Sequence, residues 1–366
     1  MLDETWSIKR AFNWTRDYLT EKGDEQARLS TEWLLSYACN LSRIDVYTQF
    51  DKPLSLDERE YLREAVRRRA AGEPLQYIVG EAGFRHLTLK VKPKVLIPRP
   101  ETEVLVDLAL EALPTPAEGV ELHVLDLCTG SGCIGLALAS ERPDVQVIAT
   151  DISPEAVKLA NDNAEACNLA DRFKAIEADL FEAKKRDRNS DSSGKEECVA
   201  EHGGTSAHSA EKNGDYRLHF SGRERKHSER NDAKQSFPNG AHCSRRQRGE
   251  CPHTQLRTGI HQFDLIVSNP PYIPTSGMDA LPKEVADFEP ALALHGGDDG
   301  LDIARRILEE APQYLKESCA LILELDVRNV DLACDFAVQL NTYNSVDVEC
   351  DLTGRRRFVL AKTLSS

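Results

Sequence analysis

The sequence predicts an α/β protein built on a mostly parallel sheet, because strand-like and helix-like segments alternate after residue 120. Apolar runs of strand length occur at 122–127, 145–149 and 173–178, and a helical pattern follows each of the first two. This alternation predicts a parallel sheet with helices on both faces. A chain of 366 residues with 40% apolar composition can bury a large core, and we expect two domains.

The first domain is expected to be helical and to occupy residues 1–78. Apolar residues recur at helical spacing in two segments that start near Ile8 and Leu29. A third helix is expected to begin at Ser55, an N-cap residue followed three positions later by Glu58. This domain by itself indicates no chemistry.

A β-hairpin linker is predicted over 79–99, where apolar residues alternate with polar ones and Pro93-Lys94 suggests the turn. The catalytic domain is then expected over 100–366, starting with a helix that has Pro100 at its first position. Near the C-terminus the patterns predict a helix at 303–315 and strands at 320–325 and 358–360.

An inserted segment at 184–262 interrupts the predicted catalytic domain. It holds 16 Lys and Arg against 11 Asp and Glu, and seven of the ten histidines, but few large apolar residues. Too little apolar surface is available to offset the entropy of ordering, so we predict disorder. Two functions remain alternatives here: a basic tether for ribosomal RNA, or a zinc site of unusual spacing that uses His242, Cys243, Cys251 and His253.

Composition excludes some classes of function. The net charge of -15 argues against duplex nucleic acid as the main partner, because phosphate binding needs a basic face. The ten cysteines show no paired CxxC spacing, so we expect reduced thiols and no zinc site in the framework. The first residues resemble no secretory signal and no later stretch reaches membrane-spanning length, so we expect a cytoplasmic protein.

A glycine motif, Gly130-x-Gly132-x-x-Gly135, stands between a predicted strand and a predicted helix, so a nicotinamide dinucleotide must be considered. Asp151, at the end of the next strand, would bind a ribose in either case. Asp126 favours S-adenosylmethionine, because its carboxylate suits an ammonium group and would repel a pyrophosphate. Asp179-Leu180 would contact an adenine ring. The plainer alternatives are a turn residue at Asp126 and a helix cap at Asp151.

A second motif, Asn269-Pro270-Pro271-Tyr272, follows the apolar run at 263–268. The prolines end ladder pairing and stiffen the loop, while the Asn side chain and the exposed backbone carbonyls offer hydrogen-bond partners. Such a platform can hold a planar NH2 group by its hydrogens. Because the carboxyl ends of parallel strands meet at one crevice, we expect both motifs in one site.

With these motifs in order, the chain resembles the release factor glutamine methyltransferase family, also called PrmC or HemK. The resemblance covers nearly the whole chain outside the insertion. It implies a Rossmann-like class I methyltransferase fold with a seven-stranded sheet, and N5-methylation of the Gln in the Gly-Gly-Gln motif of class 1 peptide release factors. It rests on the stretches Gly72–Gly80, Pro98–Glu103, Asp126–Gly132, Asn269–Ile273 and Phe288–Leu294.

The resemblance also implies roles for individual residues. Asn269, the Pro270 carbonyl and Tyr272 would act on the substrate amide, with Pro271 and the apolar Leu96 beside it. The predicted contacts to S-adenosylmethionine are Asp126, Thr129, Gly130, Ser131, Gly132, Asp151, Asp179, Leu180 and Asn269.

The chain departs from this family at two places, the insertion and Asp326, where relatives usually have Gly after a strand, so that turn is expected to differ. Three alternatives for function stay open. The nearest is glutamine methylation of a large-subunit ribosomal protein. The next is adenine-N6 methylation, which would need a basic groove. The third is a binding module without catalysis.

Overall fold

The computed structural model describes residues 6–116, 119–183 and 262–364. The insertion predicted at 184–262 lies outside these residues except for Gln262, and so do its four candidate zinc ligands.

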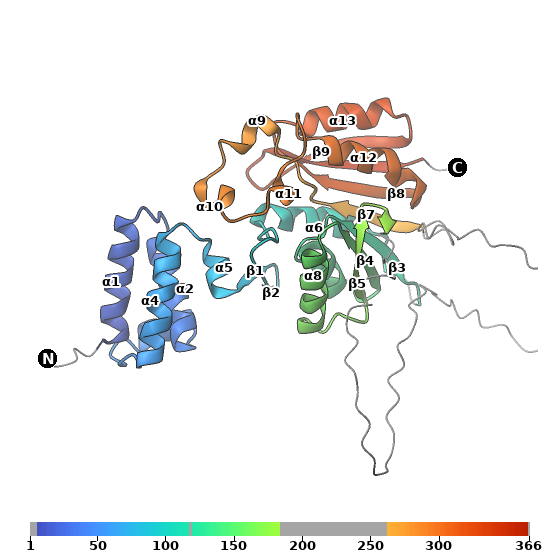
Figure 1. Ribbon diagram of the computed structural model, residues 1–366. Helices are drawn as coiled ribbons and strands as arrows, with labels where there is room; N and C mark the ends of the chain where they lie inside the picture. The colour runs from blue at the N-terminus through green and yellow to red at the C-terminus, as the bar shows by residue number, and fades with distance from the viewer. Residues whose placement is uncertain (1–5, 117–118, 184–261, 365–366) are drawn as a thin grey trace, which may run out of the picture. The chain divides into compact units, whose positions relative to one another are not determined.

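Five helices occupy the described part of the N-terminal region, from residue 6 onward (Figure 1). Ser55 caps the fourth helix in a capping box with Glu58, as the sequence predicts, and the apolar faces bury a cluster that includes Leu19, Leu34 and Leu35. The sequence predicted three of these helices, and α3 and α5 are too short for periodicity to reveal. They are α1 (Ile8–Glu21), α2 (Ala27–Cys39), α3 (Arg43–Thr48), α4 (Leu56–Ala70) and α5 (Leu75–Val79).

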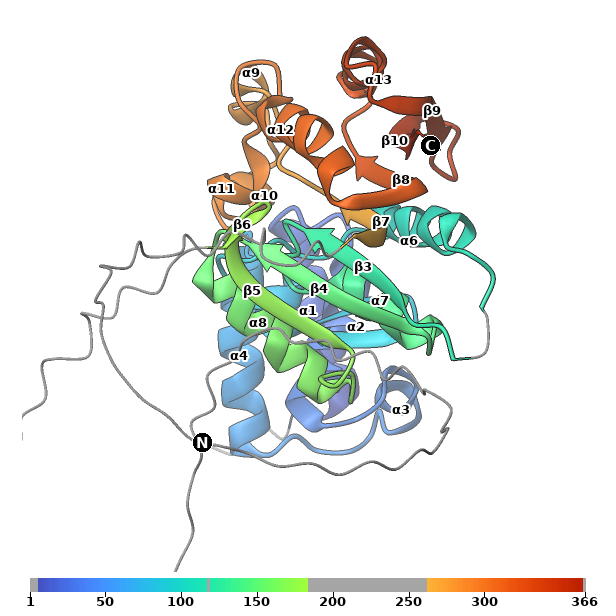
Figure 2. The ribbon, with the colours of Figure 1, turned by 90° about the vertical axis from the view of Figure 1, so that its right-hand side faces the viewer.

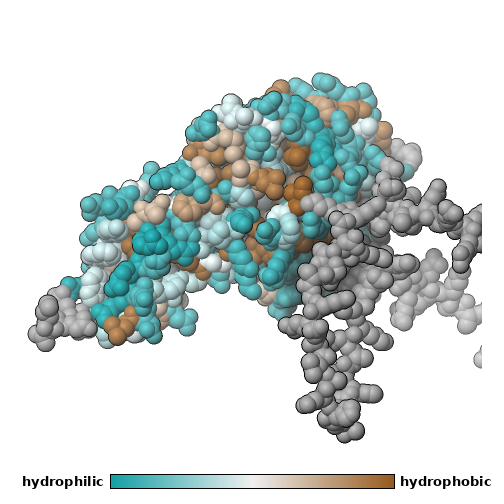
Figure 3. Space-filling model, in the orientation of Figure 1, coloured by the Kyte–Doolittle hydropathy of each residue, from teal (hydrophilic) through white to brown (hydrophobic). Residues whose placement is uncertain are grey.

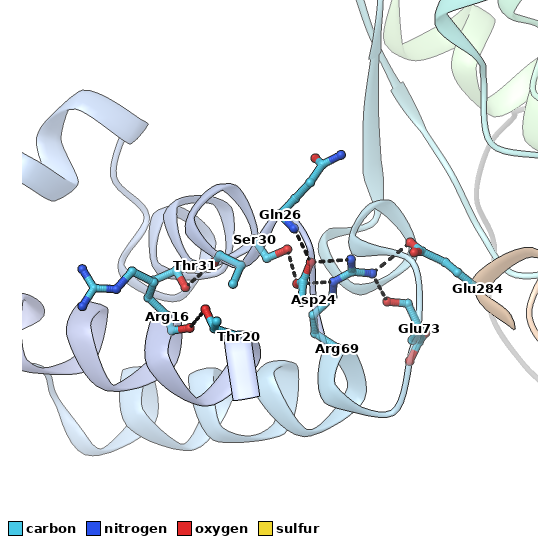
Figure 4. Close-up of polar contacts among 10 residues, drawn as sticks. Arg16, Thr20, Asp24, Gln26, Ser30, Thr31, Arg69, Glu73 and Glu284 are labelled. Atoms are coloured by element: carbon cyan, nitrogen blue, oxygen red, sulfur yellow. Dashed lines mark hydrogen bonds and ion pairs between the residues drawn. The ribbon is translucent and has the colours of Figure 1, made fainter. Parts of the chain in front are cut away.

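Arg69, near the end of α4, is the centre of a polar network (Figure 4). Its side chain is only 11% exposed and donates to both carboxylate oxygens of Asp24, at 2.8 and 3.1 Å. The same guanidinium donates to the Glu73 carbonyl at 3.0 Å and to Glu284 at 2.9 Å. Arg69 is therefore a structural residue, and its neighbours in the run 67–69 are more exposed.

The linker is a hairpin, but its turn is not where the sequence suggested. Strands β1 (Glu81–Phe84) and β2 (Leu87–Lys90) pair in antiparallel fashion, and the chain reverses at Arg85, whose φ is 50°. The expected turn at 93–94 is present, with the Val95 N–H donating to the Lys92 carbonyl at 3.3 Å, but the expected strand at 95–97 is wrong. The alternating apolar residues there instead bury Val95 and Ile97 in two small clusters.

The central sheet has seven strands of six or more residues among the described residues, with the two-residue β6 (Glu182–Ala183) on one edge. The strand order is β6-β5-β4-β3-β7-β8-β10-β9, and Figure 2 shows β5, β4, β3, β7 and β8 side by side. The central pairs are parallel, and β10 runs antiparallel to both neighbours. This confirms the predicted mostly parallel sheet. The strands are β3 (Leu122–Leu127), β4 (Val145–Asp151), β5 (Phe173–Asp179), β7 (Phe263–Ser268), β8 (Leu315–Glu324), β9 (Tyr343–Cys350) and β10 (Arg356–Thr363).

Both faces of the sheet are covered, and neighbouring strand residues belong to different cores. Val124 packs into one cluster with α6 (Pro100–Ala112), α7 (Cys133–Glu141) and α8 (Pro154–Ala166), while Leu125 packs into another. The second cluster contains residues of α12 (Asp302–Glu310) and α13 (Val330–Gln339).

The molecular surface in Figure 3 is largely hydrophilic on the face shown, with hydrophobic residues gathered near its centre.

The C-terminal part differs in detail from the sequence prediction. The helix expected at 303–315 ends at Glu310, and a short 3-10 helix (Ala311–Gln313) follows because Pro312 lacks a backbone donor. Strand β8 starts at 315 rather than 320, and β9 and α13 were not predicted. Short helices α9 (Thr275–Met278), α10 (Lys283–Ala286) and α11 (Ala291–Leu294) complete the described elements. No helix within the described ranges has both the length and the apolar character needed to cross a membrane.

Gly135 provides a test of this packing. A Cβ built there would lie 2.8 Å from Phe173 and 2.8 Å from Val147, under the close contact of α7 with the sheet. We expect Gly135→Ala to lower the free energy of unfolding. The steric cost is roughly 1–3 kcal/mol, and the higher helix propensity of alanine offsets ~1 kcal/mol of it. Denaturant unfolding measures this. Gly83→Ala is the control, because no atom lies within 4 Å of its Cβ position, and an equal effect there would contradict the packing argument.

Candidate functional site

One pocket opens at the carboxyl ends of β3, β4, β5 and β7. Its wall includes nine of the thirteen residues that the sequence singled out: Leu96, Thr129, Gly130, Ser131, Asp151, Asp179, Leu180, Asn269 and Pro271. The other four, Asp126, Gly132, Pro270 and Tyr272, are not among the residues that line it. Both sequence motifs therefore meet at one crevice, as strand topology predicted.

The glycine turn forms the floor between β3 and α7. Gly130 and Gly132 have φ values of 57° and 85°, which favour glycine, and a Cβ at Gly132 would lie 3.2 Å from Ala160 and from Phe173. The Gly130 N–H donates to Asp151 Oδ2 at 2.9 Å. Cys128 and Leu180 also have left-handed backbones, although neither is glycine, and both line the pocket. Strained backbone of this kind is concentrated at functional sites.

Asp126 is fully buried next to the glycine turn. Its Oδ2 accepts hydrogen bonds from Thr129 Oγ1 at 2.7 Å and from the Gly135 N–H at 3.1 Å, whereas Oδ1 has no partner among the described residues. Burial raises the pKa of this carboxyl to about 7, although the two hydrogen bonds lower it. Asp126 therefore does stabilise the turn, which was the plainer alternative from the sequence, and its Oδ1 remains without a hydrogen bond among the described residues.

Asp151 and Asp179 lie at the ends of β4 and β5. Asp151 accepts from the Gly130 and Ser153 N–H groups, at 2.9 Å each, and Ser153 rather than Asp151 is the N-cap of α8. A carboxylate has about four lone-pair sites, so Asp151 can accept a further hydrogen bond from a ligand. Asp179 forms an ion pair with Arg306 of α12 at 3.0 Å, and both side chains are nearly half exposed. The sequence reasoning did not find Arg306, which also lines the pocket.

The Asn-Pro-Pro-Tyr loop is fixed on several sides. Asn269 Nδ2 donates to Thr102 Oγ1 at 3.1 Å, across a sequence separation of 167 residues. Downstream, the Ile273 N–H donates to the Leu294 carbonyl at 2.8 Å, and Asn329 Nδ2 donates to the Tyr272 carbonyl at 2.9 Å. The loop is therefore a rigid platform whose carboxamide faces the pocket.

Two glycines that the sequence reasoning missed press against the carbonyls of this platform. A Cβ at Gly296 would lie 2.6 Å from the Pro271 carbonyl oxygen, and one at Gly300 would lie 2.3 Å from that of Tyr272. Either contact is too short to exist, so any larger residue would displace the loop. The sequence gives little indication of the roles of Gly296 and Gly300, because their contacts join segments that are distant in the chain.

The turn after β8 accommodates Asp326 without glycine-like geometry. Asp326 does not have the left-handed backbone that favours glycine, and its Oδ1 accepts from the Arg328 N–H at 2.9 Å and from Arg328 Nε at 2.7 Å. These bonds lower the pKa of the Asp326 carboxyl against the effect of burial. Hydrogen bonds from Arg328 therefore stabilise Asp326 at the position where relatives usually have glycine.

Known proteins resemble this chain over most of its length. The family model for the PrmC N-terminal domain matches residues 10–80, and that for the methyltransferase small domain matches residues 102–191. A release factor glutamine methyltransferase of Geobacter sulfurreducens is 39% identical over 324 residues, which cover 88% of this chain and 86% of that protein. The chain belongs to the release factor glutamine methyltransferase family.

Other members agree with this assignment. The Rhodopirellula baltica member is 31% identical and covers 98% of this chain and 96% of its own length. A human member is 30% identical, with 96% and 86% covered. The chain is therefore a methyltransferase that uses S-adenosylmethionine, and methylation of release factor glutamine follows from the same membership.

The residues of the pocket suit this cofactor. Asp126 Oδ1, a buried carboxylate oxygen without a partner among the described residues, would attract a cationic ligand and repel a pyrophosphate. The glycine turn, Asp151 and Asp179 would hold the remainder, and Leu180 adds an apolar contact. The roles of these residues toward the cofactor stay predictions.

Asp126 makes stability depend on pH. Its carboxyl keeps its proton in the folded state up to about pH 7 but loses it near pH 4 when unfolded, so stability falls between these values as pH rises. Asn keeps the acceptor for Thr129 and Gly135 without this charge. We therefore expect the difference in free energy of unfolding, Asp126→Asn minus wild type, to increase by about 1.4 kcal/mol for each pH unit of rise in this window. Denaturant unfolding at several pH values measures it, and parallel pH curves would contradict it.

Proposed function

We propose that the enzyme methylates the side-chain N5 nitrogen of the Gln in the Gly-Gly-Gln motif of class 1 peptide release factors. The observation that carries this proposal is the position of Asn269, whose carboxamide lies in the wall of the same pocket as the glycine turn and is held by Thr102. A side-chain amide placed there would be next to the cofactor site.

A carboxamide nitrogen is a poor nucleophile, because its lone pair is delocalised into the carbonyl group. S-adenosylmethionine, when bound, supplies an electrophilic methyl group on a sulfonium. Asn269 cannot take a proton at working pH, so no conventional base is expected from it. The protein would instead hold both N–H groups with acceptors and aim the nitrogen lone pair.

The proposal assigns two acceptors to the platform: Asn269 Oδ1, and the carbonyl of Pro270, although Pro270 does not line the pocket. Asn269 Nδ2 donates to Thr102, so Oδ1 is the end of the carboxamide that would accept from the substrate. Tyr272 would stack on the amide plane and Leu96 would cover it from the opposite loop. Leu96 lines the pocket, whereas the Tyr272 ring packs partly into the core, so stacking requires its exposed part.

The helical domain and the cellular location complete the proposal. Residues 1–78 would help to grip the release factor, and the domain boundaries 1–78, 79–99 and 100–366 are part of this hypothesis. We place the enzyme in the cytoplasm, where release factors act, with neither a membrane nor a nucleic acid as a partner.

Asn269→Ala tests the central role. We expect a loss of at least ~3 kcal/mol in transition-state stabilisation, about a hundredfold in rate, because one acceptor for the reacting amide disappears. Affinity for S-adenosylmethionine, measured by calorimetry, should stay nearly unchanged. Asn341→Ala, at an exposed position after α13, is the control. A near-wild-type rate of methyl transfer in Asn269→Ala would end the proposal for this residue.

The substrate is identified by a labelling experiment. The enzyme is incubated with labelled S-adenosylmethionine and a class 1 release factor, its Gln→Ala variant, ribosomal protein or DNA, and the label is located by mass spectrometry. We expect label on the Gly-Gly-Gln glutamine and none on the variant. Label on ribosomal protein or adenine would favour the corresponding alternative, and failure to bind S-adenosylmethionine would favour a binding module.

A further inference from the structure

The orientation of the Asn269 carboxamide has two possible states. The two ends of a carboxamide have nearly the same shape, but one accepts hydrogen bonds and the other donates them. With Nδ2 toward Thr102, Oδ1 is offered to the pocket; after a flip, the pocket would receive a donor. A substrate N–H needs an acceptor, so only the first state is productive.

Thr102 alone cannot select between these states. Its hydroxyl can accept from Asn269 Nδ2 at 3.1 Å, as observed, or donate to Asn269 Oδ1 after a flip. It is 2% exposed, so exchange with bulk water does not decide the direction. A second acceptor that takes the single hydroxyl proton of Thr102 would leave only its lone pairs for Asn269.

Glu324 stands where such an acceptor is needed. It is the last residue of β8, and the register of β8 against β7 aligns Leu323 with Ser268, so Glu324 and Asn269 are the next residues on neighbouring strands. Its exposure is 0%, and neither of its carboxylate oxygens has a hydrogen bond of standard geometry among the described residues. The Thr102 hydroxyl is nevertheless close enough to lower the pKa of this carboxyl.

We propose that Glu324 and Thr102 are positioning residues: Glu324 accepts the Thr102 proton, and Thr102 then accepts only from Asn269 Nδ2, which turns Oδ1 toward the substrate amide. Glu324 is absent from the pocket wall, so it acts through Thr102 and not on the substrate. This inference rests on the proposed function of Asn269 and explains why an apparently unsatisfied acid is buried behind it.

The protonation state of Glu324 gives a consequence for pH. Burial raises its pKa to about 7; Thr102, Arg357 and Arg99 lower it, Glu101 raises it, and the phenol of Tyr272 also faces it. Protonated Glu324 would donate to Thr102 and send the Thr102 proton toward Asn269 Oδ1. The turnover number should therefore rise with pH through the neutral range, and Thr102→Val should lack this rise. Any contribution from Asp126 would appear in both proteins.

A double-mutant cycle tests the proposal with release factor as substrate. Thr102→Val keeps the side-chain shape without the hydroxyl, and Glu324→Gln keeps the size but can donate as well as accept. We expect each to lower kcat about tenfold, with KM for the release factor and the affinity for S-adenosylmethionine nearly unchanged. The double variant should lose about tenfold rather than about a hundredfold, because both changes break one chain of hydrogen bonds.

Thr102→Ser is the matched control, since it restores the hydroxyl and should lose much less activity than valine. Unfolding in denaturant shows whether each variant is folded under assay conditions. Additive losses in the cycle, a wild-type kcat for Thr102→Val, or a serine variant as impaired as valine would each overturn the inference. If the wild-type enzyme itself leaves release factor glutamine unmodified, the proposed function fails instead, so the two failures are distinguishable.

Discussion

The lateral register of the central strands is the constraint on which the site depends. Ile176, Thr150, Leu127, Ser268 and Leu323 are aligned across β5, β4, β3, β7 and β8. The next residue of each strand therefore stands at the same edge of the sheet, and among these are Asp151, Asn269 and Glu324. The Ser268 hydroxyl reinforces the row with a hydrogen bond of 2.7 Å to the Leu127 carbonyl. A slip of one residue would exchange the two faces of a strand and take its terminal side chain out of the site.

Much of this arrangement could be predicted because it depends on local patterns in the sequence. Apolar runs marked the central strands, glycine spacing marked the turn at Gly130, and the two prolines marked the end of β7. Parallel topology then implied that these features meet at one crevice. The meeting of these features at one crevice follows from the chirality and connection rules of the fold.

The parts that sequence reasoning missed depend on contacts between distant residues. Thr102 meets Asn269 across 167 positions, and Gly296 and Gly300 are required only because loop carbonyls pass close to them. Thr102 lies in the stretch Pro98–Glu103 that supports the family resemblance, but that stretch does not indicate its partner, and no local pattern distinguishes Gly296 and Gly300 from ordinary loop positions. The error in the hairpin has a similar cause: Pro93-Lys94 does form a turn, but Val95 and Ile97 are buried in separate clusters and do not pair as a strand.

Two buried carboxyls stand at the active edge of the sheet, one on each side of the platform strand. Asp126, on the cofactor side, and Glu324, behind the substrate side, are both fully buried, and burial raises both pKa values to about 7. Each leaves at least one oxygen without a partner among the described residues, which costs free energy in the unliganded fold. A cation beside Asp126 would remove part of that cost, whereas in the arrangement proposed above Glu324 would be stabilised by the Thr102 hydroxyl in addition to Arg357 and Arg99. In the proposed mechanism, which has no general base, burial of Asp126 would thus serve binding of the cofactor and burial of Glu324 would serve the geometry of Asn269.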